Sequence, residues 1–415
     1  MNNSTLNNRT ILISGASVAG PALAYWLSRY GFEPTVVERA PAPRSGGNAI
    51  DIRGGSREVA ERMGIMPAVR QALTHQRGMS FVNQQGQPQA TMSVELFNGE
   101  GLVSDCEILR GDLVDILYQA SKDSAEYRFN DSITSLTDGE EGVLVTFEKG
   151  PPRTFDLVVG ADGLHSNVRA LTFGPESRFI RHLGYYVSIF TTANHLHLDR
   201  WQLVYNMPGK LTGIYTAHQN TETKAMFFFA SPQLQYDRHN ISEQKQILAR
   251  VYAGAGWETP YLLKAMESAP DFYFDSISLI QLERWSRGRI ALLGDAGYCS
   301  SPLSGQGTNL ALVGAYTLAG ELAAASGDHH IAFARYQEEL QDYARRQQKA
   351  ASDGGKWFIP PNQAMIQLRN LNMRLLSYLP WKGLIAKAIQ RQTAITLKEY
   401  QDAEAQRCSL TEASC

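Results

Sequence analysis

Three short motifs contain the residue types that could do chemistry in this chain. They are Gly15-Ala16-Ser17-Val18-Ala19-Gly20, Gly160-Ala161-Asp162-Gly163 and Gly294-Asp295-Ala296, and each one follows an apolar run of strand length. Any one of them could be a glycine turn that serves packing alone. Three of them at the ends of three buried-type strands, with Arg110 between, are hard to explain by packing and indicate a common binding site.

The first motif predicts a site for a dinucleotide. The apolar run Thr10–Ser14 is expected to form a strand, the residues after Gly20 a helix to about Tyr30, and Thr35–Val37 a second strand that ends at Glu38. Such a β–α–β unit places a pyrophosphate on the helix N-terminus and an acidic residue on the adenine-side ribose. Ser17 stands where the G-x-G-x-x-G fingerprint has its middle glycine, and its hydroxyl could donate to a phosphate.

A second glycine-rich stretch lies between Arg44 and Gly55, with Gly46, Gly47 and Gly54 inside it. Glycine at this density indicates sharp turns or a close backbone approach to a ligand. The stretch is either a flexible loop or a loop around an anionic cofactor, served by Arg44 or Arg53.

Composition describes an ordinary folded protein of 415 residues, with 43% hydrophobic and 19% charged residues and a net charge of -2. This balance gives no electrostatic reason to expect nucleic acid or an anionic membrane as a partner. Four scattered cysteines without a C-x-x-C pair favour a reducing compartment. The polar N-terminus indicates neither a signal peptide nor a membrane span. We therefore expect a soluble, cytoplasmic protein that is a monomer.

The remaining pattern predicts a second, β-rich unit and a helical tail. Short antiparallel strands are expected within 78–106, a helix beginning at Glu107, and a mostly antiparallel, aromatic sheet within 174–285. The aromatic residues of that sheet either line a ligand site or fill a core. Helices are expected at 331–350, at 363–379 and at about 383–400.

Other chemistry is not indicated. His195 and His197 have metal-like spacing, but no third ligand accompanies them, so we predict no metal site. No Ser/His/Asp set or pair of carboxylates stands out, and we predict no catalytic acid or base residue.

With these motifs in view, the chain resembles the class A FAD-dependent monooxygenases, the aromatic-hydroxylase-like flavoproteins. The most specific stretch is the one from Asp156 to Arg169, and the resemblance extends from Thr10 to Ala325. Three runs resemble the tetracycline-inactivating branch, the tetracycline destructases. These runs are Gly46–Asp51, Glu107–Leu113 and Ser301–Ala311, and the departures from the pattern are Ser17 and an extra residue between Gly47 and Asp51.

The resemblance implies an α/β fold: a Rossmann-like FAD-binding domain, a mostly antiparallel substrate domain and a C-terminal helical segment. The implied divisions are 1–77, 101–173 and 286–350 for the FAD-binding domain, 78–100 and 174–285 for the substrate domain, and 351–415 for bridging helices. The cofactor-binding residues predicted from the motifs and the resemblance are Gly15, Ser17, Gly20, Glu38, Arg39, Arg44, Asp51, Arg110, Asp162, Asp295, Pro302, Gly305, Gly307 and Asn309. Predicted substrate contacts are Tyr205, Tyr215, Phe227 and Pro302.

The implied activity is hydroxylation with FAD, an electron donor and O₂, through a flavin C4a-hydroperoxide. NADPH is the expected donor, with Arg44 as the candidate for its phosphate, and NADH stays open. The expected substrate is a polycyclic aromatic or enolic small molecule of tetracycline type. The alternatives are a hydroxylase of another aromatic polyketide or phenol, a flavin-dependent reductase, halogenase or decarboxylase, and a non-catalytic flavin- and drug-binding protein. The halogenase motif W-x-W-x-I-P is absent from the sequence.

Overall fold

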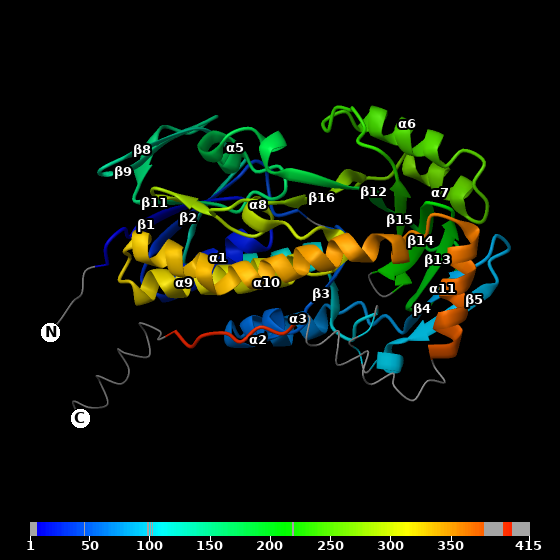
Figure 1. Cartoon of the computed structure of the whole chain (residues 1–415). Helices are drawn as coiled ribbons and strands as arrows, with labels where there is room; N and C mark the ends of the chain where they lie inside the picture. Colours follow the sequence, from blue (N-terminus) through cyan, green and yellow to red (C-terminus); the bar gives the residue numbers. More distant parts are fainter. Residues whose placement is uncertain are drawn as a thin grey trace, which may run out of the picture.

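Two β-sheet units lie side by side in the structure, a computed structural model, and one long helix runs along both of them (Figure 1). The structure describes residues 6–44, 46–97, 99, 101, 103–217, 220–376 and 393–400. Within these residues, no helix is both long and apolar enough to span a bilayer.

The first unit is built on a six-stranded sheet in the order β17-β18-β11-β1-β2-β7, in which only β17 is antiparallel to its neighbour. The strands are β1 (Thr10–Ser14), β2 (Glu33–Glu38), β7 (Glu126–Phe129), β11 (Leu157–Gly160), β17 (Ser286–Arg287) and β18 (Ile290–Leu292). The apolar run Ile11–Ile13 is fully buried because both faces of the sheet are covered, as is usual for parallel strands.

Helices cover one face of this sheet and a small second sheet covers the other. The helical layer comprises α1 (Ala19–Arg29), α2 (Gly55–Arg62), α3 (Met66–Gln71), α4 (Arg110–Ser121), α9 (Gly307–Ala324) and the first part of α10 (His329–Phe358). On the other face are β8 (Ile133–Gly139), β9 (Gly142–Phe147), β10 (Arg153–Phe155) and α5 (Asn167–Phe173). Small residues let α9 pack closely, because a side chain at Gly314 would collide with Tyr298.

The second unit is a seven-stranded sheet in the order β16-β12-β15-β14-β13-β4-β5, antiparallel except for the β4–β13 pair. Its strands are β4 (Gly78–Val82), β5 (Pro88–Ser93), β12 (Ile180–Ala193), β13 (Trp201–Met207), β14 (Lys210–Ala217), β15 (Glu222–Ala230) and β16 (Tyr273–Ile280). The prediction of an α/β fold with a mostly antiparallel second sheet is therefore confirmed.

The two faces of this second sheet have different neighbours. Helices α6 (Ile241–Val251) and α7 (Thr259–Met266) pack on the outer face. The inner face packs against the end of α10, α11 (Gln363–Leu376) and Leu303 of the short helix Pro302–Ser304. A two-stranded ribbon of β3 (Ala49–Asp51) and β6 (Glu107–Leu109) lies between the units, and its Ala49 packs against the inner-face cluster.

Three sequence predictions about elements need correction. Glu107 belongs to strand β6, and the helix begins at Arg110, because Glu107–Leu109 pairs with β3. Helices α6 and α7 were not predicted. Of the last helix expected, at about 383–400, the part up to residue 392 lies outside the described residues. The described residues 394–400 are not helical. There the chain is held by side-chain contacts instead, with the Tyr400 hydroxyl donating to Glu321 at 2.8 Å.

The predicted domain boundaries stay predictions. Helix α10 passes without a break through residue 350, where one of them was drawn.

Candidate functional site

The three glycine and aspartate motifs meet at one edge of the six-stranded sheet. In the parallel ladders Ser14 is paired with Gly160, and Gly160 with Leu292, so the three strands end at the same level. Ligands of such sheets bind beyond the carboxyl ends of the strands. The motifs, distant in sequence, therefore form one continuous surface there.

The Gly15 turn depends on the absence of side chains. Gly15 has a φ of +107°, and a Cβ atom on it would lie 2.6 Å from the carbonyl oxygen of Ala161. A Cβ atom on Gly20 would collide with the carbonyl oxygen of Gly15. In the described chain, no side chain caps the first turn of α1, and Ser17 is exposed beside it. The free N–H groups at this helix start could hold an anionic group such as a pyrophosphate.

Glu38 at the end of β2 supports this turn directly. Its carboxylate accepts hydrogen bonds from the backbone N–H groups of Ala16 and Ala40, both at 2.9 Å. The side chain is half-buried, so part of it also faces the ligand side of the sheet. Its neighbour Arg39 is exposed, as is Arg44.

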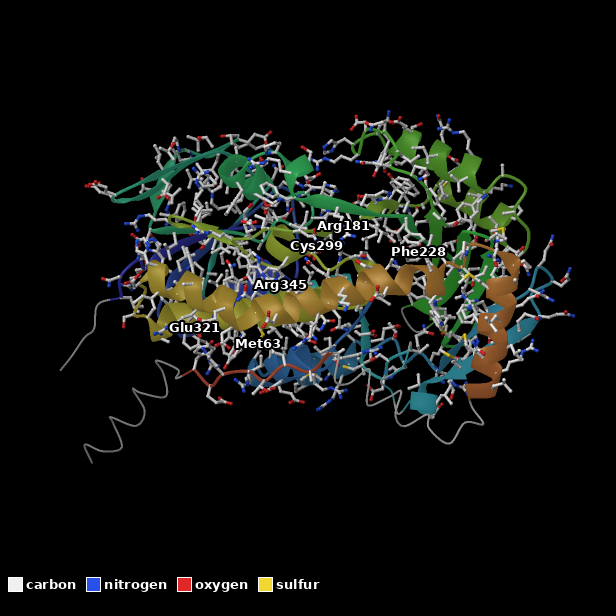
Figure 2. All side chains as sticks on the ribbon, viewed as in Figure 1. Met63, Arg181, Phe228, Cys299, Glu321 and Arg345 are labelled. Carbon is white, nitrogen blue, oxygen red and sulfur yellow. The ribbon has the colours of Figure 1, made fainter. Side chains whose placement is uncertain are left out.

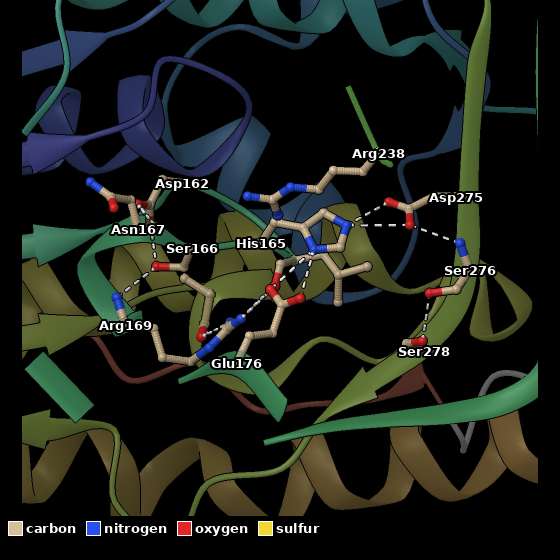
Figure 3. Close-up of polar contacts among 12 residues, drawn as sticks. Asp162, His165, Ser166, Asn167, Arg169, Glu176, Arg238, Asp275, Ser276 and Ser278 are labelled. Atoms are coloured by element: carbon tan, nitrogen blue, oxygen red, sulfur yellow. Dashed lines mark hydrogen bonds and ion pairs between the residues drawn. The ribbon is translucent and has the colours of Figure 1, made fainter. Parts of the chain in front are cut away.

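Asp162 organises the loop after β11. It accepts from the N–H groups of Asn167 at 2.9 Å and Val168 at 3.0 Å, and from the Ser166 hydroxyl, which itself caps α5 (Figure 3). Burial raises the pKa of this carboxyl above its ordinary value and outweighs the hydrogen bonds that lower it. Asp162 could therefore hold a ligand hydroxyl while it keeps the loop in shape.

Asp295 begins the short helix α8 (Asp295–Tyr298) immediately after the third strand. Burial raises its pKa, against the lowering effects of a hydrogen bond with Cys299 and the positive charge of Arg110. The start of α9 is close by, because a Cβ atom on Gly307 would lie 4.0 Å from Asp295 Oδ1. Gly294 lies close to both α1 and α9, because a Cβ atom built on it would lie within 4 Å of Ala19 and of Ala311.

Of the other predicted residues around α9, Pro302 and Gly305 are exposed on the loop before the helix. Asn309 is buried, and its side chain is bonded within the protein. It accepts from Ser56 N–H at 2.9 Å and donates to the Gln306 side chain at 2.9 Å and the Tyr343 hydroxyl at 2.7 Å. Asn309 thus joins α2 to α9 and α10.

The glycine-rich loop contacts residues of both units. Gly46 accepts from Gly111 N–H at 2.7 Å, and the Arg110 side chain lies against Gly47. On the other side, the buried Lys224 pairs with Asp271 at 3.1 Å next to Gly46. The loop is therefore fixed from both sheets.

Asp51 is paired inside the protein with Arg53, at 2.8 Å. It stands directly across the ribbon from Glu107. Burial, together with the charge of Asp51, raises the pKa of Glu107 to about 8. Sequence reasoning did not single out Glu107 as a site residue. The β3–β6 pairing, which places Glu107 opposite the predicted Asp51, was needed to show its position.

The predicted substrate residues do not come together. Tyr215 lies on the inner face of the seven-stranded sheet, where its hydroxyl accepts from Ala49 N–H at 3.0 Å. Phe227 lies on the outer face, packed on Tyr252 beneath α6 and α7, and Tyr205 faces Trp257 on the same side.

The inner face instead presents Met226 and Phe228, which the sequence reasoning missed. Phe228, which is labelled in Figure 2, has its ring centroid 5.5 Å from that of Phe358 at the end of α10. Leu303 packs against the same cluster, next to the predicted Pro302. Residues Ala225–Phe229 of β15 are all apolar. The sequence therefore does not indicate which of them face inward.

Two hollows open along the outer side of α10, with volumes of about 490 and 240 Å³. Their lining includes Arg284, His330 and Gln337, and none of the predicted cofactor or substrate residues. Of the described residues, no group of His, Cys, Asp and Glu side chains could hold a metal ion. The arrangement best fits a large organic cofactor at the strand ends.

The family model described as "FAD binding domain" matches residues 8–350. The chain belongs to this FAD-binding family. A flavin-dependent monooxygenase from Legionella longbeachae is 42% identical over 342 residues, which cover 82% of this chain and 87% of the relative. The uncharacterized protein Rv1260 of Mycobacterium tuberculosis is 49% identical over 346 residues, covering 83% and 93%. The crystal structure of tetracycline destructase Tet(55) aligns with a TM-score of 0.82 and 38% identity, covering 96% of this chain and 100% of that one.

This flavoprotein is therefore an FAD-dependent monooxygenase of class A that resembles the tetracycline destructase branch. It binds FAD and, as a monooxygenase, acts on a small molecule with O₂. FAD supplies the redox chemistry when bound, and the protein binds, orients and shields it. A cofactor that contains a pyrophosphate fits the start of α1, where no side chain caps the helix and where Gly15 and Gly20 have no side chains.

Proposed function

We propose that this monooxygenase uses NADPH and O₂ to hydroxylate a polycyclic aromatic or enolic molecule of the tetracycline type, and so inactivates it. The observation that carries this proposal is the inner face of the seven-stranded sheet. Tyr215, Met226 and Phe228 belong to a buried apolar and aromatic cluster there, against which Ala49 of the glycine-rich loop and Leu303 of the loop before α9 also pack. A flat, multi-ring substrate matches such a surface.

The similarity to the tetracycline destructases supports the same substrate class. It covers nearly the whole of both chains, so it includes the second sheet and the helices beside it as well as the FAD-binding unit. Substrate specificity in a shared fold depends on the residues of the site. We therefore assign the substrate surface to Tyr215, Met226, Phe228 and Pro302, and not to Tyr205 or Phe227.

For FAD, we propose that the pyrophosphate lies on the Gly15–Gly20 turn with Ser17, and the adenine-side ribose on Glu38 beside Arg39. Asp51, Arg110, Asp162 and Asp295 are proposed to hold the remaining polar groups, and Gly305, Gly307 and the N-terminus of α9 to face the flavin end. Asn309 is proposed to support this end indirectly, through the bonds that hold α9 to α2.

NADPH is the proposed donor because Arg44 is exposed at the edge of the glycine-rich loop, where its guanidinium could bind a 2′-phosphate. Arg44→Ala is expected to raise KM for NADPH by about tenfold, the loss of one charged hydrogen bond. KM for NADH, which has no such phosphate, should not change. Equal effects on both donors would contradict the assignment.

The test of the function is NADPH oxidation by the FAD-loaded protein with and without tetracycline, with the absorbance of the drug followed in parallel. Faster NADPH oxidation together with loss of the drug chromophore supports both the activity and the substrate class. NADPH oxidation without any change in the drug moves the substrate to another aromatic polyketide or phenol. A flavin that NADPH does not reduce favours the non-catalytic flavin- and drug-binding alternative.

A further inference from the structure

We propose that Tyr273, Asp275, His165 and Glu176 form a proton path from the solvent to the reaction site between the two sheets. The proposal rests on the proposed function only for the identity of the substrate and the electron donor. The path itself can be tested without either of them.

The four side chains form an unbroken series of hydrogen bonds, of which Figure 3 shows the part from Asp275 through His165 to Glu176. The Tyr273 hydroxyl donates to Asp275 Oδ2 at 3.3 Å. The same oxygen accepts from His165 Nε2 at 3.0 Å, and His165 Nδ1 lies 3.0 Å from Glu176 Oε2. The two steps at His165 are short enough for a proton to move along a hydrogen bond, and the Tyr273 step of 3.3 Å is slightly longer.

The inner end of the series points toward the predicted flavin residues. Tyr273 lies on the same side of β16 as Asp275 and Ile277, the side that packs toward the first unit. Its side chain is 44% exposed, yet it is in electrostatic contact with Arg110 and with Cys299, which bonds Asp295.

The outer end is anchored and open to solvent. The Glu176 side chain is 31% exposed, whereas the Arg169 side chain that bonds it at 3.1 Å is fully buried. Arg169 also donates to the carbonyl oxygens of Leu164 and Ala296, which fixes Glu176 relative to the Asp162 and Asp295 loops. Arg238 adds a positive charge beside Glu176 (Figure 3).

The two flanking carboxylates favour a proton on His165. Burial alone would lower its pKa, but the hydrogen bonds with Asp275 and Glu176 outweigh it and raise the pKa to about 9. Tyr186 and Tyr236, which lie on the outer face of the sheet, interact with Asp275 only electrostatically, and Arg169 and Arg238 act on Glu176 with their positive charges. At neutral pH the series therefore holds one mobile proton between two carboxylates.

The reaction needs such a proton. Insertion of one oxygen atom of O₂ into a substrate consumes two electrons and two protons, and the other atom leaves as water. A hydride donor supplies two electrons and one proton, so one proton per turnover must come from the solvent. A site that excludes water needs a defined route for it.

Along this route the Tyr273 hydroxyl gives its proton to the oxygen atom that leaves as water. Tyr273 takes a proton from Asp275, Asp275 takes one from His165 Nε2, and His165 Nδ1 takes one through Glu176 from the solvent. One proton enters and one is delivered, so the four groups return to their starting state.

The deciding experiment uses the FAD-loaded protein, reduced with light and mixed with O₂. Reoxidation of reduced flavin to FAD and hydrogen peroxide takes up one proton and requires neither NADPH nor a substrate. In Tyr273→Phe, which keeps the ring and removes only the hydroxyl, we expect reoxidation to slow about 10-fold or more, as for loss of a proton-transfer group. The slowing should grow with pH, and a solvent deuterium isotope effect should appear. Tyr236→Phe is the matched control and should behave as wild type.

A second measurement needs no flavin at all. The titration of the His165 ring, followed by NMR in the FAD-free protein, should have its midpoint near 9 in the wild type. In Asp275→Asn the midpoint should move toward 6.5, and in Tyr273→Phe it should move little. A wild-type midpoint near 6.5 would overturn the proposal, because His165 would then not bond both carboxylates.

Two outcomes of the reoxidation experiment overturn the path. One is a Tyr273→Phe variant with the wild-type rate, pH profile and isotope effect. The other is a slow variant that has lost FAD affinity to the same degree, which would give Tyr273 a purely structural role. Failure of the NADPH and tetracycline assay, by contrast, would remove the proposed substrate and donor and leave the result on the path unaffected.

Discussion

At the scale of single residues, the site depends on a few positions where either a carboxylate or the absence of a side chain is required. Gly15 and Gly20 close the first turn, and Asp162 and Asp295 stand at the ends of the next two strands. A common binding role could be proposed from the sequence because glycine and aspartate turns follow three separate apolar runs. The sequence did not show which groups these residues contact, such as the Ala161 carbonyl group that lies against Gly15.

Asp295→Ala is expected to leave a folded protein that holds FAD about tenfold more weakly. The change removes the proposed polar contact with the cofactor, worth about 1–1.5 kcal/mol, and little core volume. The dissociation constant of FAD, measured by quenching of its fluorescence, checks this expectation. Asp115→Ala, on the exposed side of α4, is the control, and full FAD affinity in Asp295→Ala would contradict the assignment.

Gly15→Ala is expected to affect both FAD binding and folding. The new Cβ would lie 2.6 Å from the Ala161 carbonyl, in a backbone conformation with φ of +107° that alanine adopts only with strain. We expect a loss of about 2–4 kcal/mol in the free energy of unfolding. Chemical denaturation of the FAD-free protein measures it. Gly64→Ala has a similar positive φ but open space around it, so it separates the effect of strain from that of the collision.

At the scale of elements, alternation within one strand separates two kinds of residue that look the same in sequence. Phe227 and Phe228 are neighbours in β15, yet one lies in the core under α6 and α7 and the other on the inner face. In a strand that is apolar on both faces, apolar and polar residues do not alternate, so the sequence does not distinguish the two faces. For this reason the sequence could not distinguish Phe227 from Phe228, and the prediction of Phe227 as a substrate contact had no support from periodicity.

A matched pair of variants tests this assignment. Phe228→Leu is expected to raise KM for the polycyclic substrate about 2- to 10-fold, the worth of an aromatic contact. Phe227→Leu should leave KM unchanged and lower the free energy of unfolding by about 1–2 kcal/mol. Steady-state kinetics and denaturation of both variants give the comparison. A larger KM effect in Phe227→Leu would reverse the assignment of the two faces.

Other features could not be predicted from the sequence, for a different reason. Glu107 reads as a helix start because apolar residues follow it at helical spacing, but strand pairing with Asp51 prevails over the local pattern. His165 and Asp275 lie 110 residues apart, and only the packing of the two units brings them together. Predictions from periodicity and motifs work within an element or a motif, and they fail where a contact between units decides.

At the scale of the whole molecule, His165 makes the stability of the junction between the two units dependent on pH. Its pKa is raised from 6.5 to about 9 by Asp275 and Glu176, although burial opposes this. Because the pKa is higher in the folded state, the stabilisation is fully present below about 6.5 and is lost as the pH rises through about 9. We expect a loss on the order of 2 kcal/mol between these limits.

Urea denaturation at pH 6.5 and at pH 9.5 measures this loss. His165→Gln should reduce the difference in unfolding free energy between the two pH values, because glutamine does not titrate. His239→Gln, on the exposed segment before α6, is the control and should retain the wild-type difference. An unchanged difference in His165→Gln would assign the pH dependence to other groups.

Helix α10 links the two units in a way that bears on how this family diversifies. It packs on α9 in the first unit and reaches the inner face of the second sheet through Phe358 and Ile359, the residue that follows it. The second sheet is also drawn from two separate stretches of chain, β4–β5 and β12–β16. A gene recombination that exchanged the substrate sheet between two relatives would therefore need four crossovers, two around each stretch. It would also place a foreign sheet against a helix inherited from the other parent. With the substrate on the inner face, as proposed, we expect point changes on that face to alter substrate choice more readily than exchange of the whole sheet.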